Sequence, residues 1–415
     1  MAIDISNSIK ERRIRFENLI GGEDVSRLEV EAMPSIPINR PRIPEFWTIQ
    51  QEYNDLFSSG IITNSKYVRQ FETRIEAYLG VRHAICVSSC TTGLMLLERS
   101  LCLTGSVIVP SFTFPATVHT LIWNGLRPIF VDCESSTFSV NPAEVEENVD
   151  RDTSAILGVY IFGNPPDMER LEKIADRYKL KLIFDAAHGL GAWYKGKPCG
   201  GFGQAEVFSL APTKLLTSGE GGVIATNNDC LAERLRMGRN YGNPGNYDCE
   251  FVGLNGRMPE LSALLGLKGI DSLEEEIRRR EYLVSIYRQE LEPVKGITFQ
   301  QVKKGNRCSY NYFAILVDCD EFGMDNRGLQ HVLGERGISS RVYFYPPVHL
   351  QKAYRGYYRK YKDRLPVTDF LGRNVLCLPL FNGMEESTVY QICRAIKSIQ
   401  EQGTKTVLRI PFKQK

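Results

Sequence analysis

The sequence predicts an α/β fold: a mostly parallel sheet covered by helices on both faces, followed by a smaller α+β domain. Short apolar runs rich in β-branched residues alternate with helical stretches as far as about residue 270, which is typical of βα units. After that point the pattern changes to two apolar runs and two helical runs, which indicates a separate α+β unit.

Seven apolar runs of four to eight residues are predicted to be the strands of the main sheet. In chain order they are HAICVS (83–88), SVIVP (106–110), PIFVD (128–132), AILGVYIF (155–162), KLIFD (181–185), VFSL (207–210) and GGVIAT (221–226). The last two flank a loop of small residues that contains Lys214.

Three helical segments can be placed from their patterns. Asn141, Pro142 and Glu144 stand at the N-cap, first and third positions of a helix, which is the arrangement of a capping box. The next helix is expected over 166–179, directly before the strand KLIFD. A long amphipathic helical pattern over 261–291 follows Pro259 and is expected to connect the two domains.

These patterns predict three regions. Residues 1–34 form a charged N-terminal extension, which leads into a proline-rich extended segment. Residues 35–285 form the large domain, and residues 286–415 form the small one. Within the small domain we expect strands at 312–318 and 375–380 and helices at 326–337 and 387–399.

Composition narrows the class of protein. The chain has 415 residues, of which 43% are apolar and 24% charged, as in an ordinary globular protein with a substantial core. A net charge of +2 gives no overall field that would favour nucleic acid or an anionic membrane. The eleven cysteines include no CxxC pair, and the five histidines show no ligand spacing with them. We therefore expect reduced thiols, a cytoplasmic location, no metal site and, without a signal peptide or long apolar run, no membrane span.

Two charged side chains stand out against apolar surroundings. Lys214 lies between two predicted strands, where a lysine is either exposed to solvent or functional. Asp185 ends the strand KLIFD, and ligands of open α/β sheets bind outside the carboxyl ends of strands. An aspartate at this point either caps a helix or binds a cationic group.

Two further segments end at the same predicted sheet edge. The residues from Ser88 to Gly93 open a helix, where hydroxyl groups and backbone N–H groups either cap the helix or bind a phosphate. Phe112 and Phe114 follow the next strand and either belong to the core or cover a planar ring. A phosphate site, an aromatic ring, a carboxylate and a lysine together are the groups that pyridoxal 5'-phosphate requires.

Long ordered motifs carry a resemblance to one family. The stretch FDAAHGLGAWYKGKPCGGFGQAEVFSLAPTKLLTSGEGGVIATNN, together with SSCTTGL, VPSFTFPAT, GLNGRMPELSALLGL and YPPVHLQKAY, resembles the DegT/DnrJ/EryC1/StrS sugar aminotransferases. The similarity covers about residues 35 to 402. It implies the aspartate-aminotransferase fold (fold type I), with pyridoxal phosphate bound in the large domain.

The resemblance implies catalytic roles for three residues. Lys214 matches the lysine that forms a Schiff base with the cofactor and moves the proton in both halves of the reaction. Asp185 matches the partner of the pyridine nitrogen, and His188 matches the residue beside the phenolic oxygen. The implied amino donor is glutamate, less often glutamine, and the implied acceptor is a nucleotide-diphosphate keto sugar.

Further matches imply cofactor contacts. Phe114 occupies the position of the aromatic residue stacked on the ring, and Ser209 with the segment at Cys90 and Thr91 resembles the phosphate binders. Asn255 resembles the asparagine that reaches the phosphate of the neighbouring subunit, which implies a homodimer with shared active sites.

The chain departs from the family pattern at several points. Cys90 replaces a glycine, and a side chain in a tight turn is expected to be unfavourable. The family's VHLYG, SGWLTTGP and GYNYRM appear as VYIFG, SGIITNS and GLNGRM, all near the substrate side. Arg257 either meets a diphosphate or forms an exposed ion pair. His349 either lines the sugar pocket or packs in the small domain.

The sequence also bears on three rival functions. A dehydratase branch of the family carries a histidine where this chain has Lys214. A binding or regulatory protein without enzyme activity would have lost Asp185, Lys214 or a phosphate binder, and all are present. A nicotinamide site is not supported, because GGFG at 200–203 is not a GxGxxG motif. Within the family, a keto-cyclitol remains an alternative acceptor.

Overall fold

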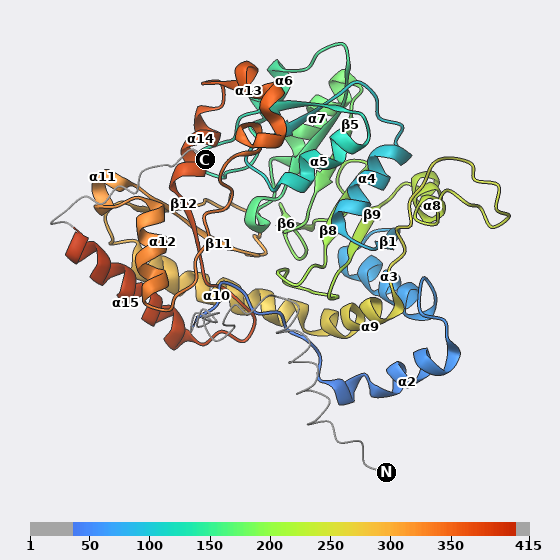
Figure 1. Ribbon diagram of the computed structural model, residues 1–415, viewed down its shortest axis with the longest axis horizontal. Coiled ribbons are helices and arrows are strands. Elements are labelled where there is room, and N and C mark those ends of the chain that lie inside the picture. Colours follow the sequence, from blue (N-terminus) through green and yellow to red (C-terminus); the bar gives the residue numbers. More distant parts are fainter. Residues whose placement is uncertain (1–35, 404–415) are drawn as a thin grey trace, which may run out of the picture. The chain divides into compact units, whose positions relative to one another are not determined.

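The main sheet is mostly parallel, as the sequence predicted. The computed structural model describes residues 36–403, so the predicted extension at 1–34 and residues 404–415 of the small domain lie outside the described part. In spatial order the strands are β1 (His83–Val87), β9 (Gly222–Thr226), β8 (Ala205–Ser209), β5 (Lys181–Asp185), β4 (Thr153–Val159), β2 (Ser106–Pro110) and β3 (Arg127–Val131) (Figure 1). In this sheet β9 alone runs antiparallel to its neighbours.

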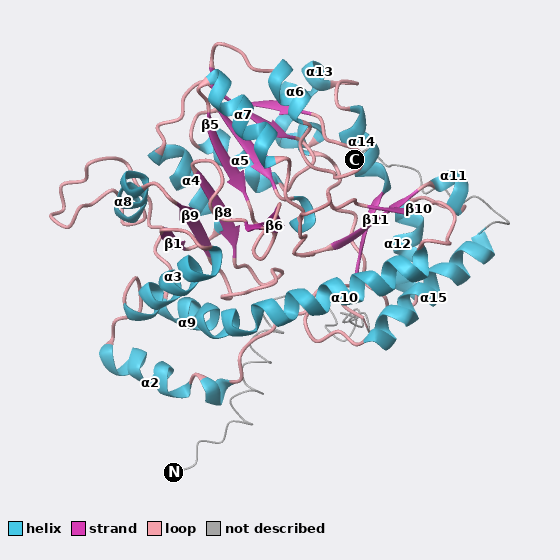
Figure 2. Ribbon diagram, turned by 180° about the vertical axis from the view of Figure 1, so that it is seen from behind, coloured by secondary structure: helices cyan, strands magenta, loops and turns pink. Residues whose placement is uncertain are grey.

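Helices cover both faces of this sheet (Figure 2). On β2, Ile108 packs into one core while Val107 and Val109 pack into the other, because successive side chains of a strand point to opposite faces. The first core includes residues of α3 (Lys66–Leu79), α7 (Met168–Tyr178) and α9 (Glu260–Gly269). The second includes residues of α4 (Cys90–Ser100), α5 (Pro115–Trp123) and α8 (Asp229–Gly238).

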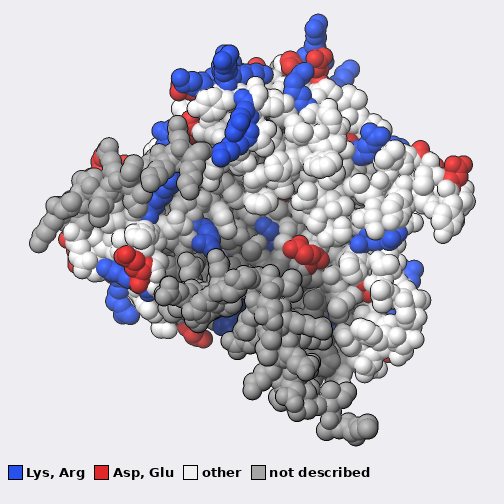
Figure 3. Space-filling view, in the orientation of Figure 1, with Lys and Arg blue, Asp and Glu red and all other residues white. Residues whose placement is uncertain are grey.

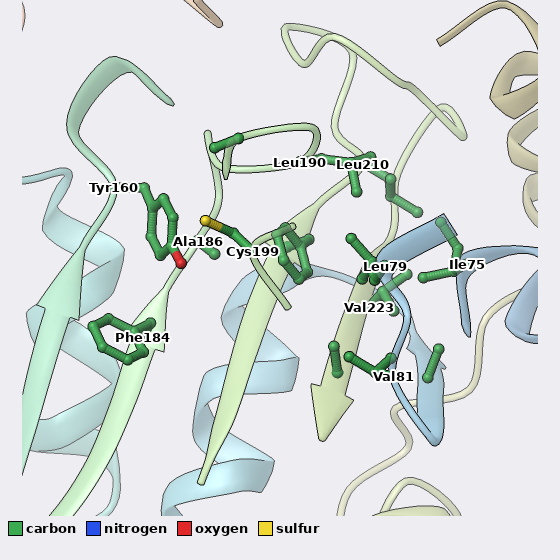
Figure 4. Packing of buried hydrophobic residues seen from close by; sticks show 14 of the residues in the cluster. Ile75, Leu79, Val81, Tyr160, Phe184, Ala186, Leu190, Cys199, Leu210 and Val223 are labelled. Atoms are coloured by element: carbon green, nitrogen blue, oxygen red, sulfur yellow. The ribbon is translucent and has the colours of Figure 1, made fainter. Parts of the chain in front are cut away.

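Figure 4 shows part of the first core. Ile75 and Leu79 of α3 lie near Val223 of β9, and Tyr160 lies above Phe184 of β5. Each fully buried side chain of this size contributes about 1.5–3 kcal/mol through the hydrophobic effect. This burial holds α3, α7 and α9 against the sheet.

The predicted helices are found with two differences. Helix α6 (Pro142–Glu147) begins at the predicted residue, but the capping box is not formed: the Asn141 side chain accepts a hydrogen bond from the Ala143 N–H at 3.0 Å, and the Asn141 N–H donates to the Asp132 carbonyl at 3.0 Å rather than to Glu144. The helical pattern over 261–291 is two helices, α9 and α10 (Leu273–Leu291), joined by the 3₁₀ turn η4 (Ile270–Ser272). The Ser272 hydroxyl donates to the Gly269 carbonyl at 3.1 Å and so competes with the main-chain bonds of a continuous helix.

A second, antiparallel sheet contains β10 (Ile297–Phe299), β11 (Phe313–Val317) and β12 (Val375–Leu378). It packs against α10, α12 (Asn326–Glu335) and α15 (Glu386–Gly403). Strand β10 was not predicted because three residues are too few for a periodic pattern. The predicted boundary after residue 285 falls inside α10, whose first part belongs to the main core and whose second part belongs to this one. The division into domains stays a prediction.

The remaining elements are short. They are α2 (Gln50–Ser59), α11 (Cys319–Phe322), α13 (Arg355–Tyr361), α14 (Pro366–Asn374), β6 (Trp193–Tyr194), β7 (Lys197–Pro198), and the 3₁₀ turns η2 (Phe46–Thr48), η3 (Ile161–Gly163), η5 (Val348–Leu350) and η6 (Lys352–Tyr354). Within residues 36–403, no helix is long and apolar enough to cross a membrane. On the face shown in Figure 3, acidic side chains lie among the Lys and Arg side chains.

Gly222 at the start of β9 allows the N-terminus of α4 to lie against the sheet. A Cβ atom at this residue would stand 2.6 Å from the backbone nitrogen of Cys90 and 2.7 Å from the carbonyl carbon of Ser89. Backbone atoms cannot move aside without displacing the helix. The close approach of β9 and α4 therefore depends on the absence of a side chain at Gly222.

We predict that Gly222→Ala lowers the free energy of unfolding by about 1–3 kcal/mol, because the added methyl group overpacks this contact. Gly334→Ala is the matched control: a Cβ there meets nothing within 4 Å in α12. The control should be neutral or more stable by up to about 1 kcal/mol. Urea unfolding of both variants measures the difference, and equal effects would contradict the role of the Gly222 contact.

Candidate active site

A cavity of about 310 Å³ opens at the carboxyl ends of β4, β5 and β8, beside the N-terminus of α4. This is the edge at which ligands bind in open α/β sheets. The residues predicted for cofactor binding at this edge line it together: Cys90, Thr91, Phe114, Asp185, His188, Ser209 and Lys214. Most of the remaining lining is apolar or aromatic.

The N-terminus of α4 and the end of β8 supply hydrogen-bond donors to one part of the cavity. Ser89 is the N-cap, and its side chain accepts a hydrogen bond from the Thr92 N–H at 3.0 Å. Cys90 and Thr91 occupy the first two positions of the helix, whose N–H groups have no acceptor within the helix. Together with the Ser209 hydroxyl, these groups are suited to bind an anion. The same segment can therefore cap α4 through Ser89 and bind a phosphate through the free N–H groups.

Cys90 does not strain the backbone. The glycine-to-cysteine departure was expected to be unfavourable in a tight turn, but Cys90 has an ordinary helical conformation and no positive φ. Its thiol is buried in the cavity wall, with Sγ 3.9 Å from Asp185 Oδ1 and 3.6 Å from the Val207 carbonyl oxygen. The expected penalty does not arise.

Asp185 is a buried carboxylate at the end of β5. Its Oδ2 accepts a hydrogen bond from the Thr117 hydroxyl at 2.7 Å, and its Oδ1 accepts one from the Ala187 N–H at 3.0 Å. Burial raises the pKa of this carboxyl, while these two donors and the charge of Lys214 counteract the rise. The next element after β5 is β6, so the alternative that Asp185 caps a helix is wrong.

Lys214 lines the cavity from the loop between β8 and β9, so the solvent-exposed alternative is wrong. The surrounding loop is held on both sides: Asn39 Nδ2 donates to the Thr213 carbonyl at 2.8 Å, and the Leu215 N–H donates to Asn311 Oδ1 at 3.2 Å. Burial lowers the pKa of the Lys214 amine, and the acidic groups of Cys90, Asp185 and Glu220 counteract part of this effect. A lysine with a lowered pKa has more of the neutral amine that attacks an aldehyde.

His188 lies among aromatic rings. Its ring is nearly parallel to those of Phe162 and Phe344, with centroids 6.4 Å away in each case, and the centroid of the Tyr312 ring lies 5.3 Å away at an interplanar angle of 82°. Ser309 donates a hydrogen bond to the His188 carbonyl oxygen at 2.6 Å. Burial, with a smaller contribution from the charge of Lys214, holds the pKa of His188 well below its ordinary value. The imidazole is therefore neutral near pH 7.

The two phenylalanines of the loop after β2 have different environments. Phe112 is fully buried among Phe138, Phe162 and Phe344 and belongs to the core. Phe114 is the N-cap residue of α5; 58% of it is exposed and it lines the cavity. Phe114 is thus the residue of this pair that can cover a planar ligand.

Three predicted residues do not line the cavity of their own chain. Asn255 is exposed, and Arg257 donates to Asn240 Oδ1 while its guanidinium stacks over the Tyr241 ring. His349 is 1% exposed and packs against Ser111 rather than in the cavity wall.

Other lining residues were not identified from the sequence. Tyr312, Tyr343 and Phe344 come from the chain around the second sheet, more than a hundred residues from the loop of Phe114. Nothing in their spacing indicates that they meet the main sheet edge. Tyr160 was noticed only as a departure from the family pattern.

The charged and polar groups that line the cavity fit pyridoxal phosphate. Asp185 is 5% exposed and keeps acceptor capacity toward the cavity, and a buried carboxylate is unfavourable without a charged or donating partner. A protonated ring nitrogen is such a partner. Among the described lining residues, Lys214 is the one Lys or Arg, and the anion-binding groups stand at the α4 N-terminus.

Comparison with known proteins gives the same assignment. Residues 47–397 match the DegT/DnrJ/EryC1/StrS aminotransferase family. The chain belongs to this family. It is therefore an aminotransferase whose cofactor is pyridoxal phosphate, as the sequence predicted.

Individual members of the family are similar over nearly the whole chain. The dTDP-4-amino-4,6-dideoxy-D-glucose transaminase of Escherichia coli is 31% identical over 87% of this chain and 98% of its own. The GDP-perosamine synthase of Vibrio cholerae is 31% identical over 83% of this chain and 94% of its own. The crystal structure of DesI, solved in the presence of its TDP-sugar product, is 33% identical, with a TM-score of 0.84 over 90% of this chain and 94% of that one. The predicted fold type is confirmed.

We predict that the cofactor-free Lys214 amine titrates at lower pH than the amine of Lys195. Burial lowers the pKa of Lys214, whereas hydrogen bonding to Glu169 raises the pKa of the exposed Lys195. Competitive acetylation over a pH series, with each lysine followed by mass spectrometry, gives both titration curves. Coincident curves, or an inverted order, would contradict the electrostatics described above.

Proposed function

We propose that this protein transfers an amino group from glutamate, or glutamine, to a nucleotide-diphosphate keto sugar, with pyridoxal phosphate as cofactor. The observation that carries the proposal is that Lys214 and Asp185 face one cavity beside the anion-binding end of α4. The similar proteins named above include a dTDP-sugar transaminase and GDP-perosamine synthase. Their names support a nucleotide-linked sugar as the acceptor here.

Bound in this cavity, the cofactor would supply an aldehyde that accepts the amino group and a ring that withdraws electrons from the substrate carbon. Lys214 is proposed to bond that aldehyde and then to move a proton with its Nζ atom. Asp185 would keep the ring nitrogen protonated, since a buried carboxylate stabilises a neighbouring positive charge. His188, neutral at pH 7, would donate or accept a hydrogen bond at the phenolic oxygen without adding a charge.

The other residues that line the cavity would bind the cofactor and shield it from water. The Ser209 hydroxyl and the N–H groups of Cys90 and Thr91 would hold the phosphate, and the Phe114 ring would cover one face of the cofactor. The apolar lining would exclude water, which strengthens the interaction of Lys214 with its acidic neighbours.

We also propose a homodimer in which each chain completes the site of the other. Asn255 is exposed and outside its own cavity, so it is available to a second copy. Large apolar side chains at and near η2 and α2 are also exposed: Phe46 by 55%, Trp47 by 72%, Phe57 by 66% and Ile62 by 63%. Clusters of exposed apolar residues of this kind mark protein interfaces.

A cytoplasmic location is proposed from the cysteines. All eleven are free thiols, which fits a reducing compartment.

We predict that replacing Lys214 or Asp185 slows amino transfer from glutamate. Lys214→Ala should lower the rate of amino transfer from glutamate by at least about a hundredfold, because the proton-transfer group is lost. Asp185→Asn should keep the fold but lower the same rate by about a hundredfold or more, because its charge at the ring nitrogen is lost.

The measurement is the visible spectrum of the protein with pyridoxal phosphate, before and after addition of glutamate. Wild-type protein should show a yellow band that bleaches with glutamate, and Lys195→Ala serves as the control that retains this behaviour. A colourless wild-type protein that takes up no pyridoxal phosphate would contradict the proposed function.

Subunit complementation tests the shared site. Lys214→Ala and Asn255→Asp chains should each be impaired alone, since the second places a negative charge near a phosphate. Co-expressed as mixed dimers, they should regain activity, because one site then combines an intact Lys214 with an intact Asn255 from the other chain. If both residues served the same chain's cavity, mixing would restore nothing.

A further inference from the structure

Two separate segments of the chain form the aromatic wall of the cavity. The loop Ser111–Phe114 follows β2 and contributes Thr113 and Phe114. The segment Tyr343–His349 comes from the region of the second sheet and contributes Tyr343 and Phe344. The rings of Phe114 and Phe344 meet at a centroid distance of 6.1 Å with an interplanar angle of 61°. The position of Phe114 therefore depends on how the two segments are held together.

Ser111 joins them through three hydrogen bonds. Its carbonyl oxygen accepts from the Val348 N–H at 3.1 Å, and its hydroxyl oxygen accepts from the His349 N–H at 3.0 Å. The same hydroxyl lies 2.7 Å from His349 Nδ1. Since the hydroxyl hydrogen is free to point at Nδ1, Ser111 can donate to the ring while it accepts from the backbone.

The other edge of the His349 ring faces α14. Nε2 lies 3.5 Å from Asp369 Oδ1, and among the described residues neither atom has a hydrogen bond of standard geometry. The histidine is 1% exposed, so both ring nitrogens are shielded from water. A buried histidine with one nitrogen bonded and the other aimed at a carboxylate has one preferred orientation.

Helix α14 is itself fixed to the main sheet. The carboxylate of Asp132, directly after β3, accepts hydrogen bonds from the Val367 and Thr368 N–H groups at 2.9 and 2.7 Å. The Asp369 carboxylate is therefore held next to the sheet. His349 connects it to Ser111 at the root of the loop that ends at Phe114.

We propose that His349 is a positioning residue: through Ser111 it sets the orientation of the loop that places Phe114 over the cofactor. The inference rests on the proposed function. His349 touches neither cofactor nor substrate, and its effect reaches the site through Ser111 and the Phe344–Phe114 contact. Its two side-chain contacts distinguish this role from simple filling of the core, because an apolar residue of similar volume would fill the space without orienting the loop.

The visible circular dichroism of bound pyridoxal phosphate tests this. The free cofactor is achiral, so its signal per unit of absorbance reports the asymmetry that the surrounding protein imposes on the ring. His349→Leu and Ser111→Ala should both change this ratio. Both should also weaken cofactor binding by about two- to tenfold, the range expected for one lost hydrogen bond. His349→Asn keeps a polar atom near Nδ1 and should restore much of the wild-type ratio. His331→Leu, which replaces an exposed histidine of α12, is the control.

Ser111→Ala removes one hydroxyl, so it keeps the test valid should His349→Leu fail to fold. An unchanged dichroism ratio and cofactor affinity in Ser111→Ala, with only a lower melting temperature, would show a purely structural role and overturn the inference. A wild-type protein without a cofactor band would instead contradict the proposed function. The two failures are therefore distinguishable.

Discussion

The arrangement of the site depends on the burial of one carboxylate. Asp185 is removed from water at the end of β5, and such a group must be surrounded by donors or positive charge. The Thr117 hydroxyl is one donor, and it is itself within hydrogen-bond distance of the Thr113 hydroxyl, at 2.8 Å. This chain of contacts ties α5 and the loop carrying Phe114 to the strand that carries Asp185. Asp185, proposed to face the ring nitrogen, and Phe114, proposed to cover the ring, are thus parts of one connected structure.

A second set of contacts comes from the region of the smaller sheet. Phe344 approaches Phe112 and Phe114 from that side, and the rings of His188, Phe162 and Phe344 lie within 6.4 Å of one another in nearly parallel planes. Aromatic side chains give a large contact area with few rotatable bonds, so they define a wall with little loss of side-chain entropy. The cavity therefore has an aromatic wall in addition to the polar groups of α4 and β8.

Most of the main sheet could be predicted because its strands are continuous apolar runs with clear boundaries. The cofactor-binding edge could be predicted for the same reason: Asp185 and Ser209 are strand ends, and Cys90 and Thr91 begin a helix after a strand.

The aromatic wall could not be predicted, since Tyr312, Tyr343 and Phe344 meet this edge only through tertiary packing. The break between α9 and α10 could not be predicted from helical periodicity. It depends on the Ser272 hydroxyl, which competes with main-chain N–H groups for the Gly269 carbonyl. For His349 neither alternative describes its place fully, because its ring lies outside the cavity lining and contacts Ser111 and Phe130 of the main-sheet region, far away in the chain.

The loop that carries Lys214 has a mechanical property that follows from the register of its two strands. Ser209 and Gly222 are directly paired where β8 and β9 meet, so the loop leaves and re-enters the sheet at neighbouring points. The residues that bracket the loop also border the anion-binding end of α4. Both ends of the loop are therefore held beside the proposed phosphate site. In an evolving lineage, changes of length or sequence within the loop could alter the reach of the amine while the proposed phosphate site keeps its place at the sheet edge.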